Sequence, residues 1–343
     1  MNLRSLGAPV SYGLALSLVL LSILLFALWR DHEGKLAAAE GRVEAMALGS
    51  DRLLNMQMRN LERALEGIAL DSRQLSTQAP ADAQRLRREM VQGVDFRHAE
   101  LRDVVLVDRD GAVLDGGGNG DATISTWTQD PRNRAKGGGL LVGPPAQAGD
   151  GEWIVPLAVP ATIGADGQQG WVLARLRLQA LGQLVEGLDT GRDGVANIFH
   201  LAGRMVARSP MPARGLGGDF SGSQLMGQML AQRRPEVADL VSPLDRKRRL
   251  IAYRSLEHYP FAVAVGVSRD EVLATWYGFA IAAALVCVGY VLGWLLLVRT
   301  LVVANRRQSV LLAELGASQD TLLEAQRIAG LGSYHLDLAT QIV

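Results

Sequence analysis

The sequence holds a single cysteine, Cys287, and its 35 basic side chains balance its 35 acidic ones. One cysteine cannot close a disulfide within the chain, so any exported domain must be held together by its hydrophobic core. Proteins that bind nucleic acid through its phosphates carry a basic excess, which is absent here. We therefore expect neither a disulfide-linked fold nor a nucleic-acid partner.

The sequence also lacks the common signatures of catalysis. It contains no Gly-x-x-x-x-Gly-Lys-Ser/Thr phosphate loop and no Gly-x-Ser-x-Gly nucleophile elbow. No two of its five histidines stand at metal-ligand spacing, so we expect no metal and no cofactor. The segment 217–220 reads Gly-Gly-Asp-Phe, which is similar to the signature of diguanylate cyclases but lacks its second acidic residue, so we expect a turn. We predict no enzymatic activity for this chain.

Two apolar runs without a charged side chain cover residues 9–29 and 276–298. Because a helix rises 1.5 Å per residue, about 20 residues cover the hydrocarbon core of a bilayer. A cleaved signal peptide is the alternative for the first run, but the run is longer than a signal core and no small-x-small pair follows Trp29. We therefore expect two transmembrane helices.

Basic residues next to these runs indicate the orientation of the chain. Arg4 precedes the first run, and Arg299, Arg306 and Arg307 follow the second. By the positive-inside rule, residues 1–8 and 299–343 are cytoplasmic, and residues 30–275 lie on the far side of the membrane.

The exported segment begins with a helical pattern over residues 35–78, followed by a shorter helix over 81–94. Strands and turns then alternate twice, over about 95–187 and about 190–270. If the sequence is aligned with itself so that Gly203 matches Gly111, the predicted strand 196–199 matches the predicted strand 104–107. This offset of roughly 90 residues indicates two copies of one α/β unit.

This arrangement resembles the double Cache family of extracytoplasmic sensors in bacteria. Residues 259–273 are similar to that family's closing strand and exit helix, and residues 194–199 and 203–210 to the opening of its second unit. The resemblance implies an α+β fold, with two transmembrane helices flanking a long helix and two tandem PAS-like antiparallel-sheet units. It also implies a multi-pass protein of the inner membrane with residues 30–275 in the periplasm.

The cytoplasmic part begins with a predicted linker helix over residues 299–328. Leu312, Leu315 and Leu322 occupy heptad positions whose seam also holds Gln319 and Gln326. The segment is either a solvated connector or a dimer helix, and we favour a homodimer. Residues 329–343 resemble the opening of a cytoplasmic PAS domain, so we expect the rest of that domain and an output domain to follow Val343.

In double Cache sensors the ligand usually lies in the membrane-distal unit, behind an aromatic and polar stretch after the first hairpin. The resemblance places Trp127 as a π face, Asp130 as a counter-charge for a cation, and Arg132 as a fork for a carboxylate. Trp153 would close the pocket. Alternatively, both tryptophans belong to the core and both charges to the surface. The family's amino-acid-sensing pattern is absent from the sequence.

These features predict the input module of a transmembrane receptor for an extracytoplasmic small molecule. The long Cache input followed by PAS is most similar to cyclic-di-GMP proteins with GGDEF and EAL outputs, so we expect synthesis or hydrolysis of cyclic-di-GMP beyond residue 343. The alternatives are the input region of a sensor histidine kinase and a membrane-anchored binding protein without enzymatic output. No HAMP-like segment follows the second run, which disfavours a chemoreceptor.

Overall fold

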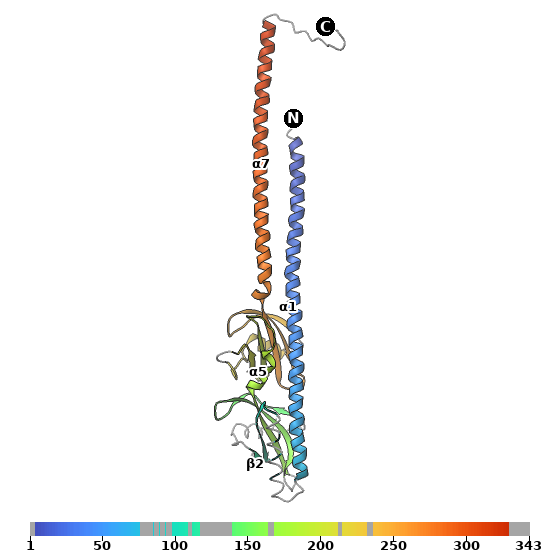
Figure 1. Ribbon diagram of the computed structural model, residues 1–343, viewed down its shortest axis with the longest axis vertical. Coiled ribbons are helices and arrows are strands. Elements are labelled where there is room, and N and C mark those ends of the chain that lie inside the picture. The colour runs from blue at the N-terminus through green and yellow to red at the C-terminus, as the bar shows by residue number, and fades with distance from the viewer. Residues whose placement is uncertain are drawn as a thin grey trace. The chain divides into compact units, whose positions relative to one another are not determined.

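The computed structural model describes residues 4–75, 85, 89, 93, 98–108, 112–116, 139–163, 168–211, 215–231 and 236–328. The chain divides into two compact units (Figure 1). We name Met1–Asp31 with Trp276–Val343 the helical unit, and His32–Thr275 the sheet unit.

The helical unit consists of parts of two long helices, α1 (Arg4–Leu75) and α7 (Arg269–Ile328). Both carry an apolar window with no buried residue, and both are long enough to cross a membrane. Side chains exposed in this way suit a lipid environment better than water.

Polar contacts join α1 and α7 within this unit. Ser17 Oγ donates to the carbonyl of Gly13, and the hydroxyl oxygens of Ser17 and Tyr290 are hydrogen-bonded at 2.6 Å. Near the other end, Trp276 Nε1 donates to the carbonyl of Leu28 at 2.9 Å. A Cβ on Gly13 would lie 3.0 Å from the Trp294 ring, so this glycine lets the two helices approach.

The sheet unit contains two antiparallel sheets with the same strand order. The first sheet has the order β2-β1-β6-β5-β3, with β4 also paired to β5, and the second has β8-β7-β11-β10-β9. In each sheet the opening hairpin pairs its first strand with the last strand of the unit. The predicted repeat and fold class are therefore confirmed.

The bounds of the strands agree closely with the alternating patterns of the sequence. The first sheet comprises β1 (Leu101–Asp108), β2 (Val113–Gly116), β3 (Leu141–Val142), β4 (Ala146–Gln147), β5 (Trp153–Ile163) and β6 (Gln168–Arg177). The second comprises β7 (Val195–His200), β8 (Arg204–Ser209), β9 (Glu236–Val241), β10 (Arg248–Ser255) and β11 (Phe261–Ser268). The sequence pattern does not predict β3 and β4, which have two residues each, or the edge strand β9.

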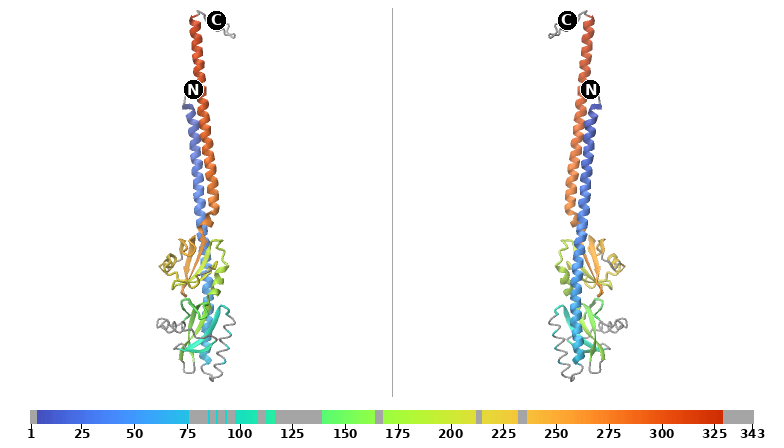
Figure 2. Two further views of the ribbon diagram at one scale, coloured as in Figure 1. Left: turned by 90° about the vertical axis from the view of Figure 1, so that its left-hand side faces the viewer. Right: turned by 90° about the vertical axis from the view of Figure 1, so that its right-hand side faces the viewer.

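Helix α1 supplies the common core of both sheets (Figure 2). Its fully buried side chains recur at helical spacing, so one stripe faces the sheets: Val43, Ala47, Leu54, Met58, Leu61 and Leu65. Helix α5 (Leu178–Glu186) adds Leu178, Leu181 and Val185 to the same core. The predicted helix over 35–78 thus continues the first apolar run as one helix, with no proline to break it between Trp29 and Leu75.

Each sheet also has an outer face, turned away from α1. On the second sheet this face is covered by α6 (Gln224–Ala231), whose Met226 and Met229 pack on Phe199 and Ile251. On the first sheet it carries a smaller apolar cluster: Val105, Val107, Leu141, Ala158 and Leu173, with Trp171 beside them.

Of the predicted helix over 81–94 the structure describes three residues, all helical, and the PAS-like segment 329–343 lies outside the described residues.

Candidate functional site

A β-bulge in β1 turns two charged side chains to the outer face of the first sheet. Leu101 pairs with Leu176 and Asp103 pairs with Arg175, so Arg102 is one extra residue in the ladder. Leu101 and Val104 both point into the core, which leaves Arg102 and Asp103 together on the other side. Bulges commonly redirect side chains in this way.

Asp103 and Arg175 form a buried ion pair across β1 and β6. Arg175 Nε donates to Asp103 Oδ1 at 2.6 Å, and Arg175 Nη2 donates to Asp103 Oδ2. The Arg175 side chain is 6% exposed and that of Asp103 is 13% exposed. A paired guanidinium and carboxylate in this geometry fix each other's position and offset part of the cost of burial.

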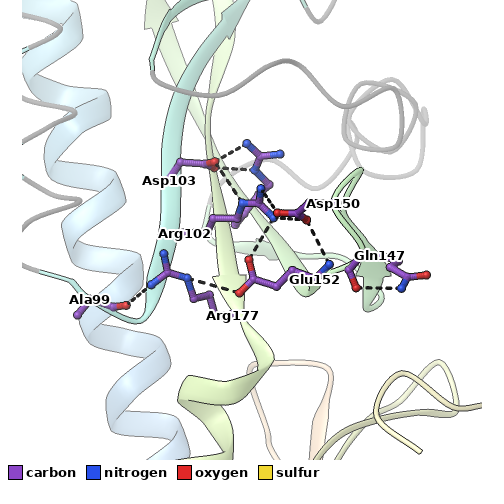
Figure 3. Close-up of polar contacts among 9 residues, drawn as sticks. Ala99, Arg102, Asp103, Gln147, Asp150, Glu152 and Arg177 are labelled. Atoms are coloured by element: carbon purple, nitrogen blue, oxygen red, sulfur yellow. Dashed lines mark hydrogen bonds and ion pairs between the residues drawn. The ribbon is translucent and has the colours of Figure 1, made fainter. Parts of the chain in front are cut away.

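Further charges extend this pair to the surface (Figure 3). Arg102 contacts Asp150 at 2.8 Å and Glu152 at 3.1 Å, and Arg177 contacts Glu152 at 3.6 Å. The hydrogen bond from Arg102, together with the backbone N–H of Glu152, lowers the pKa of Asp150 to about 2. Asp150 therefore stays charged at neutral pH.

The outer face of the first sheet thus has an apolar part and a charged end. Val105 lies opposite Leu173, which lies opposite Ala158, and the next row toward the charged end is Asp103, Arg175 and Pro156. A face of this kind suits a small molecule with an apolar body and a charged group.

The structure locates one of the four predicted ligand residues. Trp127, Asp130 and Arg132 lie outside the described residues. Trp153 is half-buried against the core on the α1 side, and a Cβ on Gly217 would lie 2.4 Å from its ring. Gly217 has a φ of +70° and permits this approach between the first sheet and the turn at 216–217. The role of these four residues in a pocket stays a prediction.

Asp103 and Arg175 are not among the predicted site residues, although the sequence holds a signal for them. Each is a charged residue in a strand with an apolar run, Leu-Arg-Asp-Val-Val-Leu-Val-Asp for β1 and Trp-Val-Leu-Ala-Arg-Leu-Arg within β6. A charge inside a buried strand needs a partner. The sequence does not tell which of many charges that partner is.

Glu62 on α1 connects the two sheets of the sheet unit. Its Oε1 accepts the backbone N–H of Leu140 at 2.8 Å, just before β3, and its Oε2 accepts the hydroxyl of Tyr259 at 2.7 Å, in the turn between β10 and β11. Burial, together with the hydrogen bond to Glu62, raises the pKa of Tyr259. One carboxylate of α1 therefore contacts both the segment before β3 of the first sheet and the turn before β11 of the second sheet.

The segment 187–194, which links α5 to β7, is held from several sides. Arg42 on α1 donates to the carbonyl of Asp189 at 2.7 Å and to its carboxylate at 3.0 Å. Glu271 in the first turn of α7 accepts the backbone N–H groups of Arg192 and Asp193, both at 3.3 Å. We name residues 187–194 the inter-unit linker; a groove of about 310 Å³ lies between it, α1 and α7.

Residues 179–266 match a family model named dCache_1_like, with the description "Histidine kinase sensor domain". Over this segment, which is about a quarter of the chain, the sequence is similar to that family. No curated protein matches the sequence of the chain.

Solved structures share the fold at low sequence identity. The extracellular domain of rpHK1S-Z16, assigned as a histidine kinase, has a TM-score of 0.60 at 21% identity, covering 70% of this chain and 99% of its own. The ligand-binding domain of the Pseudomonas fluorescens chemoreceptor CtaA in complex with L-isoleucine has a TM-score of 0.51 at 14% identity, covering 71% and 98%. The ligand-binding domain of Mlp24 with asparagine has a TM-score of 0.51 at 15% identity, with the same coverages.

Proposed function

We propose that this chain is the sensory input region of a transmembrane histidine kinase, with the sheet unit outside the membrane and a small molecule as its ligand. The observation that carries the proposal is the continuity of β11 with α7. The last strand of the second sheet ends at Ser268, and α7 begins at Arg269 and continues without a break through the apolar run to Ile328. A shift of that strand can therefore move a single helix along its whole length.

A histidine kinase output is better supported than a cyclic-di-GMP output. The matching family model is described as a histidine kinase sensor domain, and rpHK1S-Z16 is assigned as a histidine kinase. Nothing in the comparisons or the described residues favours synthesis or hydrolysis of cyclic-di-GMP, so that expectation stays a prediction. A homodimer in the bacterial inner membrane, with a PAS domain after the linker helix, completes the proposal.

The outer face of the first sheet is our proposed ligand site. Its apolar rows around Val105 and Leu173 would hold the body of the ligand, and the Asp103–Arg175 end would hold its charged group. Amino acids are the first compounds to test, because CtaA and Mlp24 carry isoleucine and asparagine.

Ligand binding would bias the receptor through Glu62 and the inter-unit linker. The backbone of Leu140 leads into β3 and contacts Glu62, which also contacts Tyr259 next to β11. The linker follows α5 directly and contacts Glu271 on α7. Such contacts transmit a signal only if the ligand binds two arrangements of them with different affinity.

The ligand proposal is tested by thermal unfolding of the full chain in detergent against the 20 amino acids, common organic acids and polyamines. At least one compound is expected to raise the unfolding midpoint. Trp171→Leu, beside the apolar rows, should weaken the binding of that compound roughly tenfold. Phe220→Leu, next to the outer face of the second sheet, should leave its affinity unchanged. A folded chain that no compound stabilises would contradict a ligand site on the first sheet.

The output is tested on the complete gene product. Autophosphorylation from ATP that changes with the ligand would support the kinase, and ligand-dependent conversion of GTP to cyclic-di-GMP would support the expectation from the sequence instead. If the gene encodes no catalytic domain after Val343, the membrane-anchored binding protein is correct.

A further inference from the structure

The second sheet holds two buried arginines that share one carboxylate. Arg249 on β10 is 2% exposed and donates from Nη1 and Nη2 to Asp245 at 2.7 and 2.6 Å. Its Nε donates to the carbonyl of Asp193 at 2.7 Å. All three donor nitrogens of Arg249 are therefore used, and Asp245 is its counter-charge.

The guanidinium of Arg208, on the edge strand β8, has fewer hydrogen-bond and charge partners than that of Arg249. Its side chain is 9% exposed, its Nη1 donates to Asn197 Oδ1 at 3.1 Å, and its Nη2 lies 3.7 Å from Asp245 Oδ2, too far for a hydrogen bond. Asp245 already accepts from Arg249 and, at 3.3 Å, from the backbone N–H of Lys247. Most of the five N–H donors of Arg208 thus have no partner among the described residues.

The charge balance of this cluster is positive. Asp245 is the only carboxylate within 4 Å of either guanidinium in the described part of the chain. Burial and the nearby Arg249 lower the pKa of Arg208, as expected for a cation in an unfavourable environment. The neighbouring acids are occupied elsewhere, since Asp193 pairs with Lys247 and Asp239 pairs with Arg248.

We propose that Arg208 and the Arg249–Asp245 pair form a binding site for an oxyanion, the carboxylate, sulfate or phosphate group of a small molecule or a lipid headgroup. The guanidinium of Arg208 binds it through paired N–H donors, the geometry that planar oxyanions and phosphates prefer. Asp245 is 32% exposed, so the cluster is reachable from solvent. The bound group neutralises the buried excess charge and links the β9–β10 turn to β8.

This site is independent of the first sheet and of the ligand proposed there. It lies in the unit whose last strand continues into α7, so its occupancy would change the stability of the sheet that carries the exit helix. The site would therefore make the receptor respond to a second compound.

The test uses the full chain in phosphate-free dodecyl maltoside, with ionic strength held constant by sodium chloride. Replacing part of the chloride with 20 mM phosphate, sulfate or acetate is expected to raise the unfolding midpoint by about 3 °C for at least one of them. Phosphatidylglycerol added to the micelles in a separate arm distinguishes a lipid headgroup from a free anion.

Arg208→Gln should abolish the rise, and Arg246→Gln, which removes an exposed charge from the same turn, should keep it. Asp245→Asn gives a second measurement if Arg208→Gln does not fold. Because this variant removes the carboxylate that competes with the anion for Arg208, the anion-dependent rise in the unfolding midpoint should be about twofold larger. No rise beyond that in chloride, an equal rise in Arg208→Gln, or a smaller rise in Asp245→Asn would each overturn the site.

Discussion

Whether a buried ionisable side chain in the sheet unit is charged or neutral depends on the groups that contact it. Asp103 and Arg175 remain an ion pair because each has the other within hydrogen-bond distance. His200 is only 5% exposed, and among the described residues no acid forms an ion pair with it. Its Nδ1 accepts the backbone N–H of Ala202 at 3.1 Å. Burial lowers the pKa of His200 to about 4, so the folded protein holds it neutral.

The neutral state of His200 makes stability depend on pH. Because its pKa is about 6.5 unfolded and about 4 folded, the unfolded chain binds more protons between these values, and stability falls as pH decreases through this window. The full pKa shift of His200 corresponds to a loss of about 3 kcal/mol in unfolding free energy. Urea unfolding of His200→Gln from pH 7 to 4 should show a flatter profile than the wild type. The exposed His258→Gln is the control, and identical profiles for all three would contradict this explanation.

The Asp103–Arg175 pair should be costly to break on one side. Asp103→Ala removes the carboxylate that holds a buried guanidinium, and we expect a loss of about 3–5 kcal/mol in unfolding free energy. Asp103→Leu combined with Arg175→Leu should recover most of it, because no charge is then buried. Asp150→Ala, at the exposed end of the network, should change little. Chemical unfolding measures all three variants, and an equal loss in the single and double variants would argue against the ion pair.

Among the elements, the inter-unit linker is tightly packed at two glycines. Gly191 has a φ of +81° with the Glu271 carboxylate 2.8 Å from where a Cβ would lie, and a Cβ on Gly194 would lie 1.9 Å from the carbonyl oxygen of Thr190. Both positions therefore require glycine. The turn presents successive backbone N–H groups to Glu271, which connects the linker to the start of α7.

Loss of the Glu271 carboxylate should loosen the inter-unit linker without unfolding the sheets. In Glu271→Ala, the amides of residues 188–194 should exchange roughly 5- to 30-fold faster, as a loss of about 1–2 kcal/mol implies. Peptides from β5 and β6 should exchange as in the wild type. Asp270→Ala is the matched control, because it removes the neighbouring carboxylate. Unchanged exchange over 188–194 in Glu271→Ala would show that these hydrogen bonds do not hold the linker.

Across the whole molecule, long-range polar contacts connect parts of the chain that also share the core around α1. Glu62 and Tyr259 are 197 residues apart, and their hydrogen bond joins α1 to the turn before β11. The same carboxylate fixes the chain just before β3. These contacts link the proposed ligand face to the strand that continues into α7.

A double-mutant cycle on Glu62→Gln and Tyr259→Phe measures this connection. Each single change should cost about 1–2 kcal/mol of unfolding free energy, and the coupling should be at least about 1 kcal/mol. Glu66→Gln with Tyr259→Phe serves as the control cycle, in which no hydrogen bond is broken between the mutated residues. Additive effects in the first cycle would show that the hydrogen bond adds nothing to stability.

The two apolar helices predict a defined topology for the chain. With Cys287 replaced by alanine, a cysteine at exposed Arg246 should react with a membrane-impermeant maleimide in intact cells, and one at Glu314 should react only after lysis. The reverse pattern would invert the orientation. Reaction at both positions in intact cells would exclude two membrane crossings.

A feature of this protein can be predicted from the sequence when it depends on residues close together in the chain, and not when it depends on distant ones. The apolar runs, the long helix and most strands follow from the spacing of apolar residues, because secondary structure responds to near neighbours. The opening and closing strands of the second sheet indicate a repeated unit, and residues 179–266, which contain most of that sheet, match the family model. The ligand stretch around Trp127 stays a prediction.

Only the tertiary structure decided which charges meet. Asp103 and Arg175 lie 72 residues apart, and the strand pairing that joins them depends on a one-residue bulge. Glu62, Leu140 and Tyr259 come together because α1 packs against both sheets. Spacing along the chain determines which face a side chain takes, but strand register and the packing of the shared core determine its partner, and these depend on the whole fold.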